Sequence, residues 1–208
     1  MKQYRIFILF NIFAFLIVVA LVIYAKFFGS SVSALFKPPV PPTYPDERLL
    51  TYTFQILCTV PVVVCSFTWS LLRVLQPVNK HKKFIFYSAL VTGGFLINEI
   101  FRIHIMVASA GIPKQSMIVV YGVVALTYGL SFWRTIKSTP YFLLLIAIIL
   151  LAFGIMVDSL GKYYYGNFSL LEGIPKLFFQ INVSLYFWYI CQQEILRIFQ
   201  FRKNQKID

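Results

Sequence analysis

Side chains that could hold a metal ion or a haem group are scarce in this sequence. Seven acidic residues, two histidines and three cysteines occur among its 208 residues. His81 lies in a basic stretch, which leaves His104 as the one histidine within an apolar stretch and no pair to hold a haem iron. The cysteines lack the C-x-x-C or Cys/His spacing of a zinc site. We therefore expect no metal, no cofactor and no disulfide framework.

Charged side chains are also few, and long stretches of the chain contain almost none. Charged residues make up 12% of the chain and hydrophobic residues 59%, whereas a soluble domain has about 25% and roughly 45–50%. The mean hydropathy is +0.77. Most apolar residues fall in blocks of about 20, the helix length that crosses a hydrocarbon layer of ~30 Å. The sequence therefore predicts an all-α, polytopic transmembrane helical bundle.

Six apolar blocks define the helices that we expect. They form a single integral membrane domain over residues 1–208, with approximate helices at residues 6–28, 49–75, 84–108, 117–133, 141–160 and 169–197. A proline-rich loop separates the first two blocks, and proline disfavours helix there. Pro61 lies inside the second block, where loss of one backbone hydrogen bond predicts a bend in the helix.

The basic residues indicate how such a bundle is oriented. With the amino terminus inside, twelve of the nineteen Lys and Arg residues lie on the cytoplasmic side, six lie outside, and Arg102 lies within the membrane. Cytoplasmic loops of membrane proteins carry an excess of Lys and Arg. We expect six helices with both termini cytoplasmic, in a bacterial-type cytoplasmic (inner) membrane. The net charge of +12 then reflects topology and lipid headgroups, so nucleic acid is not an expected partner.

The third block is unusual because it carries ionisable side chains. Glu99 and Arg102 are three residues apart on one helix face and can pair, and Asn98 offers Arg102 a hydrogen-bond partner. His104 lies about 140° around the helix from Glu99, so it is expected to face another neighbour. A charge at mid-bilayer costs at least ~2.5–3.5 kcal/mol, which favours an orientation toward the bundle interior.

Three more ionisable residues lie near the outer ends of the last two blocks. Asp158 is at the outward end of the fifth, and Glu172 and Lys176 form a favourable i,i+4 pair at the start of the sixth. We expect the third, fifth and sixth helices to converge there. The candidate ligand-binding residues are Asn98, Glu99, Arg102, His104, Asp158, Glu172 and Lys176.

Two interpretations of this cluster stay open. It is either an ion-pair network that fixes helix register, or an outward-facing cavity in which Arg102 and Lys176 recognise an anion. The second predicts binding or transport of a small polar or lipidic solute, with membrane lipids as partners. One alternative is a non-catalytic structural or assembly subunit that binds other membrane proteins. Another, a membrane-embedded lipid-modifying enzyme, is less favoured because no catalytic motif stands out; Glu99 or Asp158 would have to act as acid or base.

Overall fold

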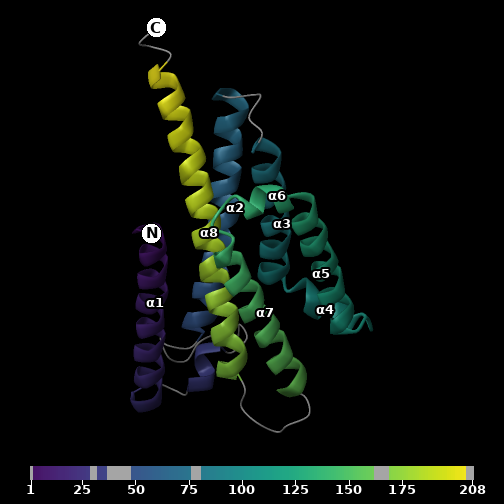
Figure 1. Cartoon of the computed structure of the whole chain (residues 1–208). Coiled ribbons are helices and arrows are strands. Elements are labelled where there is room, and N and C mark those ends of the chain that lie inside the picture. The colour runs from purple at the N-terminus through teal and green to yellow at the C-terminus, as the bar shows by residue number, and fades with distance from the viewer. Residues whose placement is uncertain (1, 29–31, 37–47, 76–80, 162–168, 205–208) are drawn as a thin grey trace. The chain divides into compact units, whose positions relative to one another are not determined.

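The structure is a computed structural model, and it describes residues 2–28, 32–36, 48–75, 81–161 and 169–204. This described part of the chain is all-helical and contains no strand (Figure 1). Its elements are α1 (Lys2–Phe27), the 3-10 helix η1 (Val32–Phe36), α2 (Leu49–Leu75), α3 (Lys82–Phe101), α4 (Ile103–Ser109), α5 (Lys114–Ser131), α6 (Trp133–Lys137), α7 (Phe142–Gly161) and α8 (Ser169–Asn204).

Three of these helices are long and apolar enough to cross a membrane, by length and composition. They are α1 from Arg5 onward, α2 and α3. Shorter apolar stretches occur in α5, at Gln115–Ser131, and in α7, at Phe142–Asp158. The helical class expected from the sequence is therefore confirmed, whereas a six-helix membrane topology stays a prediction.

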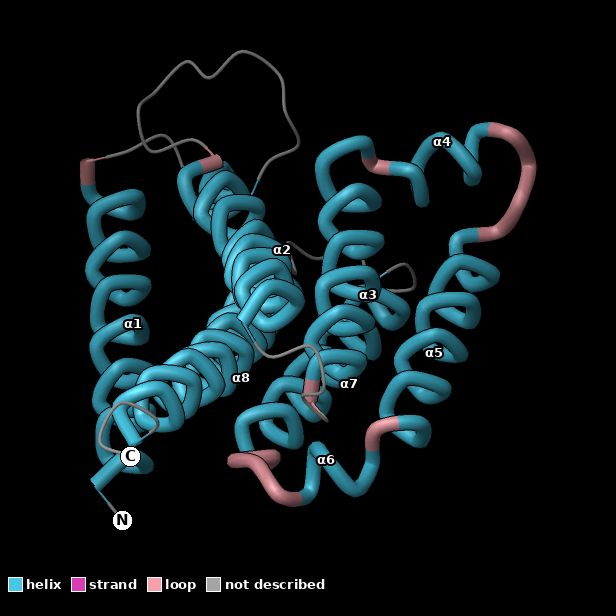
Figure 2. Tube along the Cα trace, turned by 90° about the horizontal axis from the view of Figure 1, so that it is seen from above, coloured by secondary structure: helices cyan, strands magenta, loops and turns pink. Residues whose placement is uncertain are grey.

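The expectation of one continuous helix over residues 84–108 is wrong. α3 ends at Phe101, and Arg102 has a left-handed backbone with φ 52° and ψ 43°. The Arg102 N–H donates to the Asn98 carbonyl and so closes the last turn of α3. The chain then restarts as α4, which connects α3 to α5 (Figure 2). Arg102 therefore does not continue the helix face on which Glu99 lies.

The chain divides into two compact units. Unit 1 comprises Met1–Leu57 and Phe142–Leu185, and unit 2 comprises Cys58–Tyr141 and Tyr186–Asp208. The boundaries fall inside α2 and α8, so both helices contribute to both units. Each unit thus joins segments that are far apart in the sequence.

In unit 1, α1 contacts its neighbours through one narrow stripe. The stripe residues recur at spacings of three or four and are buried or half-buried: Phe7, Asn11, Ala14, Val18, Leu21 and Ala25. Val18 and Ala25 pack in a core with Leu35 of η1, Leu50 of α2 and Leu177 of α8. The remaining faces of α1 expose Ile, Leu and Phe side chains. This spacing is that of one helix face, so α1 has a single packed side.

In unit 2, an aromatic cluster holds α3 against α5. The ring of Phe84 on α3 stacks on Tyr128 at 6.0 Å between centroids and meets Phe132 edge-on at 5.5 Å. The hydroxyls of Ser88 and Tyr128 are hydrogen-bonded at 2.6 Å. Aromatic pairs of this kind contribute beyond their buried area, so the cluster fixes how the two helices meet.

Gly173→Ala is expected to destabilise unit 1. A Cβ at position 173 would overlap the ring of Phe36, which packs on the core, so the ring would have to move. Overpacking of this kind costs about 1–3 kcal/mol. The measurement is the midpoint of thermal unfolding of the purified protein.

Gly94→Ala is the matched control, because a Cβ there meets nothing within 4 Å. Alanine also favours helix over glycine by roughly 0.5–1 kcal/mol, so this variant is expected to be neutral or slightly stabilised. Equal destabilisation of both variants would contradict the proposed role of Gly173.

Candidate functional site

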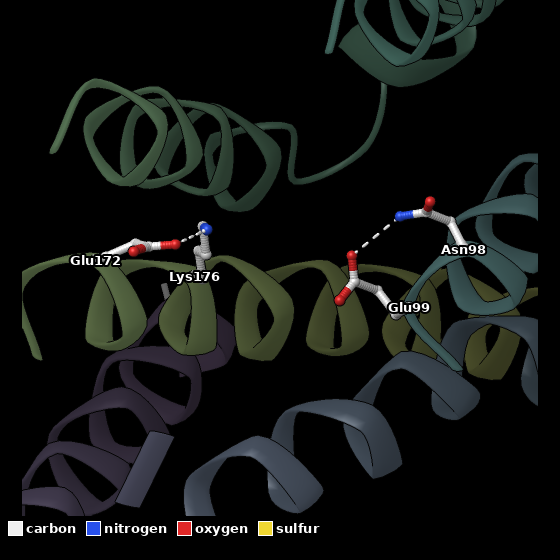
Figure 3. A network of polar contacts seen from close by, with 4 residues as sticks. All are labelled: Asn98, Glu99, Glu172 and Lys176. Carbon is white, nitrogen blue, oxygen red and sulfur yellow. Dashed lines mark hydrogen bonds and ion pairs between the residues drawn. The ribbon is translucent and has the colours of Figure 1, made fainter. Parts of the chain in front are cut away.

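Asn98 and Glu99 lie in the last turn of α3, in unit 2. Asn98 is buried and Glu99 half-buried, and Asn98 Nδ2 donates to Glu99 Oε1 at 3.2 Å (Figure 3). The Glu99 carboxylate is also close enough to Cys58 of α2 and Tyr121 of α5 for electrostatic interaction with both. Glu99 therefore faces neighbouring helices of its own unit.

Arg102 is placed differently from the expected arrangement, and the expected orientation of His104 stays a prediction. The structure bonds the Glu99 carboxylate to Asn98, and Arg102 ends α3 in a left-handed conformation. Its contact with Asn98 runs through the two backbones and not through the side chains. His104 lies in α4, and its side chain falls outside the described residues. The helix break thus takes Arg102 off the continuous helix face that carries Glu99.

A second polar group lies in unit 1, where α7 meets α8. Lys176 Nζ forms the expected i,i+4 ion pair with Glu172 Oε1 (Figure 3). A Cβ added at Gly154 of α7 would lie 3.3 Å from Lys176 Cγ and 3.4 Å from the Glu172 carbonyl oxygen, so the glycine permits this close approach. Asp158 follows Gly154 by one helical turn and so shares the face of α7 that approaches this pair.

The candidate residues thus form two groups. Asn98 and Glu99 belong to unit 2, and Asp158, Glu172 and Lys176 to unit 1. The predicted convergence of all five at one site stays a prediction. Within the described ranges, no three His, Cys, Asp or Glu side chains are grouped closely enough to hold a metal ion.

Three buried polar residues of α8 are not among the candidate residues named from the sequence. Gln180, Asn182 and Ser184 are all buried, although they lie within an apolar helix. Asn182 exchanges hydrogen bonds with Asn11 of α1, at 3.0 and 3.2 Å between amide nitrogen and oxygen. The available signal was an isolated asparagine in each of two apolar blocks, since buried amides need partners.

Gln180 and Ser184 both donate to one backbone carbonyl of α2. Gln180 Nε2 lies 3.2 Å and Ser184 Oγ 3.0 Å from the Leu57 oxygen. In a regular helix that oxygen accepts from the N–H of residue 61, but Pro61 has none. The two side chains replace the missing intrahelical hydrogen bond, as neighbouring helices do around prolines in membrane proteins.

These features define a class of protein: an all-helical chain with three helices long and apolar enough to span a membrane, and with polar side chains turned toward other helices. Residues 9–187 match the model of the family described as Domain of unknown function (DUF8692), and the chain belongs to that family. The match includes the Asn98–Glu99 and Glu172–Lys176 pairs. No curated protein and no solved structure matches this chain.

Ser184→Ala is expected to destabilise the protein by about 1 kcal/mol, because it removes one of the two donors to the Leu57 carbonyl. In a Pro61→Ala background the backbone N–H of residue 61 becomes available to the same carbonyl. The loss caused by Ser184→Ala should then be smaller. A double-mutant cycle on free energies of unfolding measures the difference.

Thr53→Ala is the control, because that exposed hydroxyl donates only to Leu49 of its own helix. Its effect should be small and the same in both backgrounds. If Ser184→Ala costs the same with and without Pro61, the Leu57 carbonyl does not depend on α8.

Proposed function

We propose that this protein is a multi-pass integral membrane protein that binds or transports a small polar or lipidic solute. The exposure of α1 supports membrane insertion, because only 11% of the residues in its most apolar stretch are buried. Exposed apolar surface of this extent marks a membrane or protein contact. In a bilayer the Ile, Leu and Phe side chains face acyl chains, and the helix satisfies its own backbone groups.

The proposed topology has six crossings, made by α1, α2, α3, α5, α7 and α8, with both termini cytoplasmic. The apolar stretches of α5 and α7 reach the lower limit for a spanning helix, roughly 17 residues. The excess of Lys and Arg in the loops then assigned to the cytoplasm supports this orientation. The short helices α4 and α6 lie at opposite surfaces in this arrangement. A bacterial-type cytoplasmic membrane is the proposed location.

The proposed solute contact in unit 2 centres on Glu99. This carboxylate interacts electrostatically with Cys58 of α2 and Tyr121 of α5, and Asn98 provides an adjacent amide. Ionisable residues inside membrane helices commonly mark binding sites or transport pathways, because an idle charge costs several kcal/mol there. Arg102, which follows at the helix end, supplies a positive charge suited to an anionic headgroup.

In unit 1, Asp158, Glu172 and Lys176 are the proposed polar contacts. The Lys176 and Glu172 side chains are 31% and 32% exposed, so the pair is accessible to a ligand and contributes little to stability. An ammonium beside a carboxylate can exchange that partner for a phosphate or carboxylate of a solute. The Glu172–Lys176 pair can therefore contribute to recognition without being required for folding.

A second candidate function is an assembly subunit for a membrane complex. The exposed faces of α1 also favour this reading, because another membrane protein could cover them as well as lipid does. The two candidates differ in what remains bound after purification. A lipid or small molecule supports solute binding, and a stoichiometric protein supports the subunit.

The topology predicts which loops are accessible from outside the cell. Ser109 and Ser138 are both exposed and lie at opposite ends of the α5–α6 segment. In a background without the three native cysteines, Ser109→Cys should react with an impermeant maleimide in intact cells. Ser138→Cys should react only after permeabilisation. Labelling of both in intact cells, or the reverse pattern, would exclude the proposed orientation.

Glu99→Gln is expected to lower the amount of co-purified solute by at least about tenfold, since a hydrogen bond to a charged group contributes ~1.5–3 kcal/mol. Untargeted mass spectrometry of the protein in mild detergent measures this loss. Glu194→Gln is the matched control, because Glu194 is another carboxylate of unit 2 and pairs with Arg197. If the wild type and Glu99→Gln retain equal amounts of co-purified solute, the proposed site is excluded.

A further inference from the structure

Two cysteines from distant parts of the chain meet inside unit 2. The Sγ atoms of Cys65, on α2, and Cys191, on α8, lie 3.8 Å apart, although 126 positions separate them in the sequence. The two residues are 0% and 2% exposed, so no bulky molecule separates or reaches them. Both are free thiols in the structure.

We propose that Cys65 and Cys191 form a reversible disulfide when a small two-electron oxidant of the peroxide class reaches them, and that this bond ties α2 to α8 within unit 2. A disulfide has an S–S bond of about 2.05 Å, so the sulfurs must approach by roughly 1.8 Å. Side-chain rotation with a small shift of the helices supplies such a movement. No other covalent change is needed.

The oxidation balances with hydrogen peroxide as the oxidant. One cysteine, as thiolate, attacks the peroxide, and the O–O bond breaks as an S–O bond forms. This leaves a sulfenic acid and a hydroxide, which takes up the proton of the first thiol to give water. The second sulfur then attacks the sulfenic sulfur, so the S–S bond forms and the second water leaves. Two thiols are oxidised and one peroxide is reduced to two waters.

Once one thiol has been oxidised, the positions of the two sulfurs favour a disulfide over further oxidation. Hydrogen peroxide is small and uncharged, so it can enter a packed interior that excludes charged reagents. Once one sulfur is oxidised, the other is already adjacent and traps it before a second peroxide arrives. A disulfide closed in this way is also shielded from bulky thiol reductants, so it persists until a small reductant enters.

Cys58 provides an internal control on the same helix. It precedes Cys65 by seven residues, which is about 10.5 Å along an α-helix. Disulfides need Cα atoms within roughly 7 Å, so Cys58 cannot pair with Cys65 while α2 stays helical. Cys58 is equally buried, so burial alone does not distinguish the three thiols.

The test uses the full-length protein in mild detergent, treated with hydrogen peroxide, then denatured, alkylated and digested. We expect a cross-linked peptide pair containing Cys65 and Cys191, lighter by two hydrogens than the sum of the two peptides, with Cys58 alkylated. Dithiothreitol should separate the pair. The oxidised protein should unfold at a higher temperature than the reduced protein, because the bond restrains the unfolded chain.

Cys58→Ser should leave the cross-link intact, whereas Cys191→Ser and Cys65→Ser should each abolish it. Because the main measurement is made on the wild-type chain, misfolding of a variant does not affect it. Sulfinic or sulfonic acid on Cys65 or Cys191 without a cross-link would overturn the proposal. Pairing with Cys58, or unreacted thiols under conditions that oxidise the denatured protein, would do the same.

Discussion

The carbonyl oxygen of Leu57 needs hydrogen-bond donors from another helix, and this need determines how α8 packs against α2 in unit 1. Pro61 deprives it of its intrahelical donor, and a bare carbonyl away from water is costly. Gln180 and Ser184 satisfy it from one face of α8, four residues apart. α8 must therefore carry polar side chains at positions 180 and 184, within a stretch that is otherwise mainly apolar. This requirement helps explain why α8, the longest helix described, is not among the three apolar candidate spans.

The same principle orders the rest of unit 1. The Asn11–Asn182 amide pair fixes the rotation of α1 about its axis, because only one helix face carries an amide. Polar side chains of unit 1 thus lie between helices beside the apolar core, and apolar side chains also cover the outer faces of α1. Apolar exposure of this extent on one helix is unusual in a soluble protein, and it favours the proposed membrane insertion.

Local patterns in the sequence predicted the helices better than they predicted which side chains meet between helices. The apolar blocks marked the main helices, Pro61 marked a missing hydrogen bond, and the i,i+4 spacing of Glu172 and Lys176 predicted their ion pair. These features depend on neighbours within about one turn.

The helix break at Arg102 could not be predicted in this way. No glycine or proline lies between Phe95 and Ala110, and a left-handed arginine is favoured only by its tertiary surroundings. The donors to Leu57 and the meeting of Cys65 with Cys191 likewise depend on how helices pack. The spacing of residues along the sequence does not indicate such contacts between helices.

The amide pair between α1 and α8 also bears on biosynthesis. Asn11 is translated with the first helix, and its partner Asn182 follows 171 residues later. In the interval Asn11 has the Phe7 carbonyl of its own helix as acceptor. Since all of Cys58–Tyr141 is translated before the second segment of unit 1 begins, unit 1 cannot close before most of unit 2 has emerged from the ribosome. The first helix made is therefore among the last to be fixed in place.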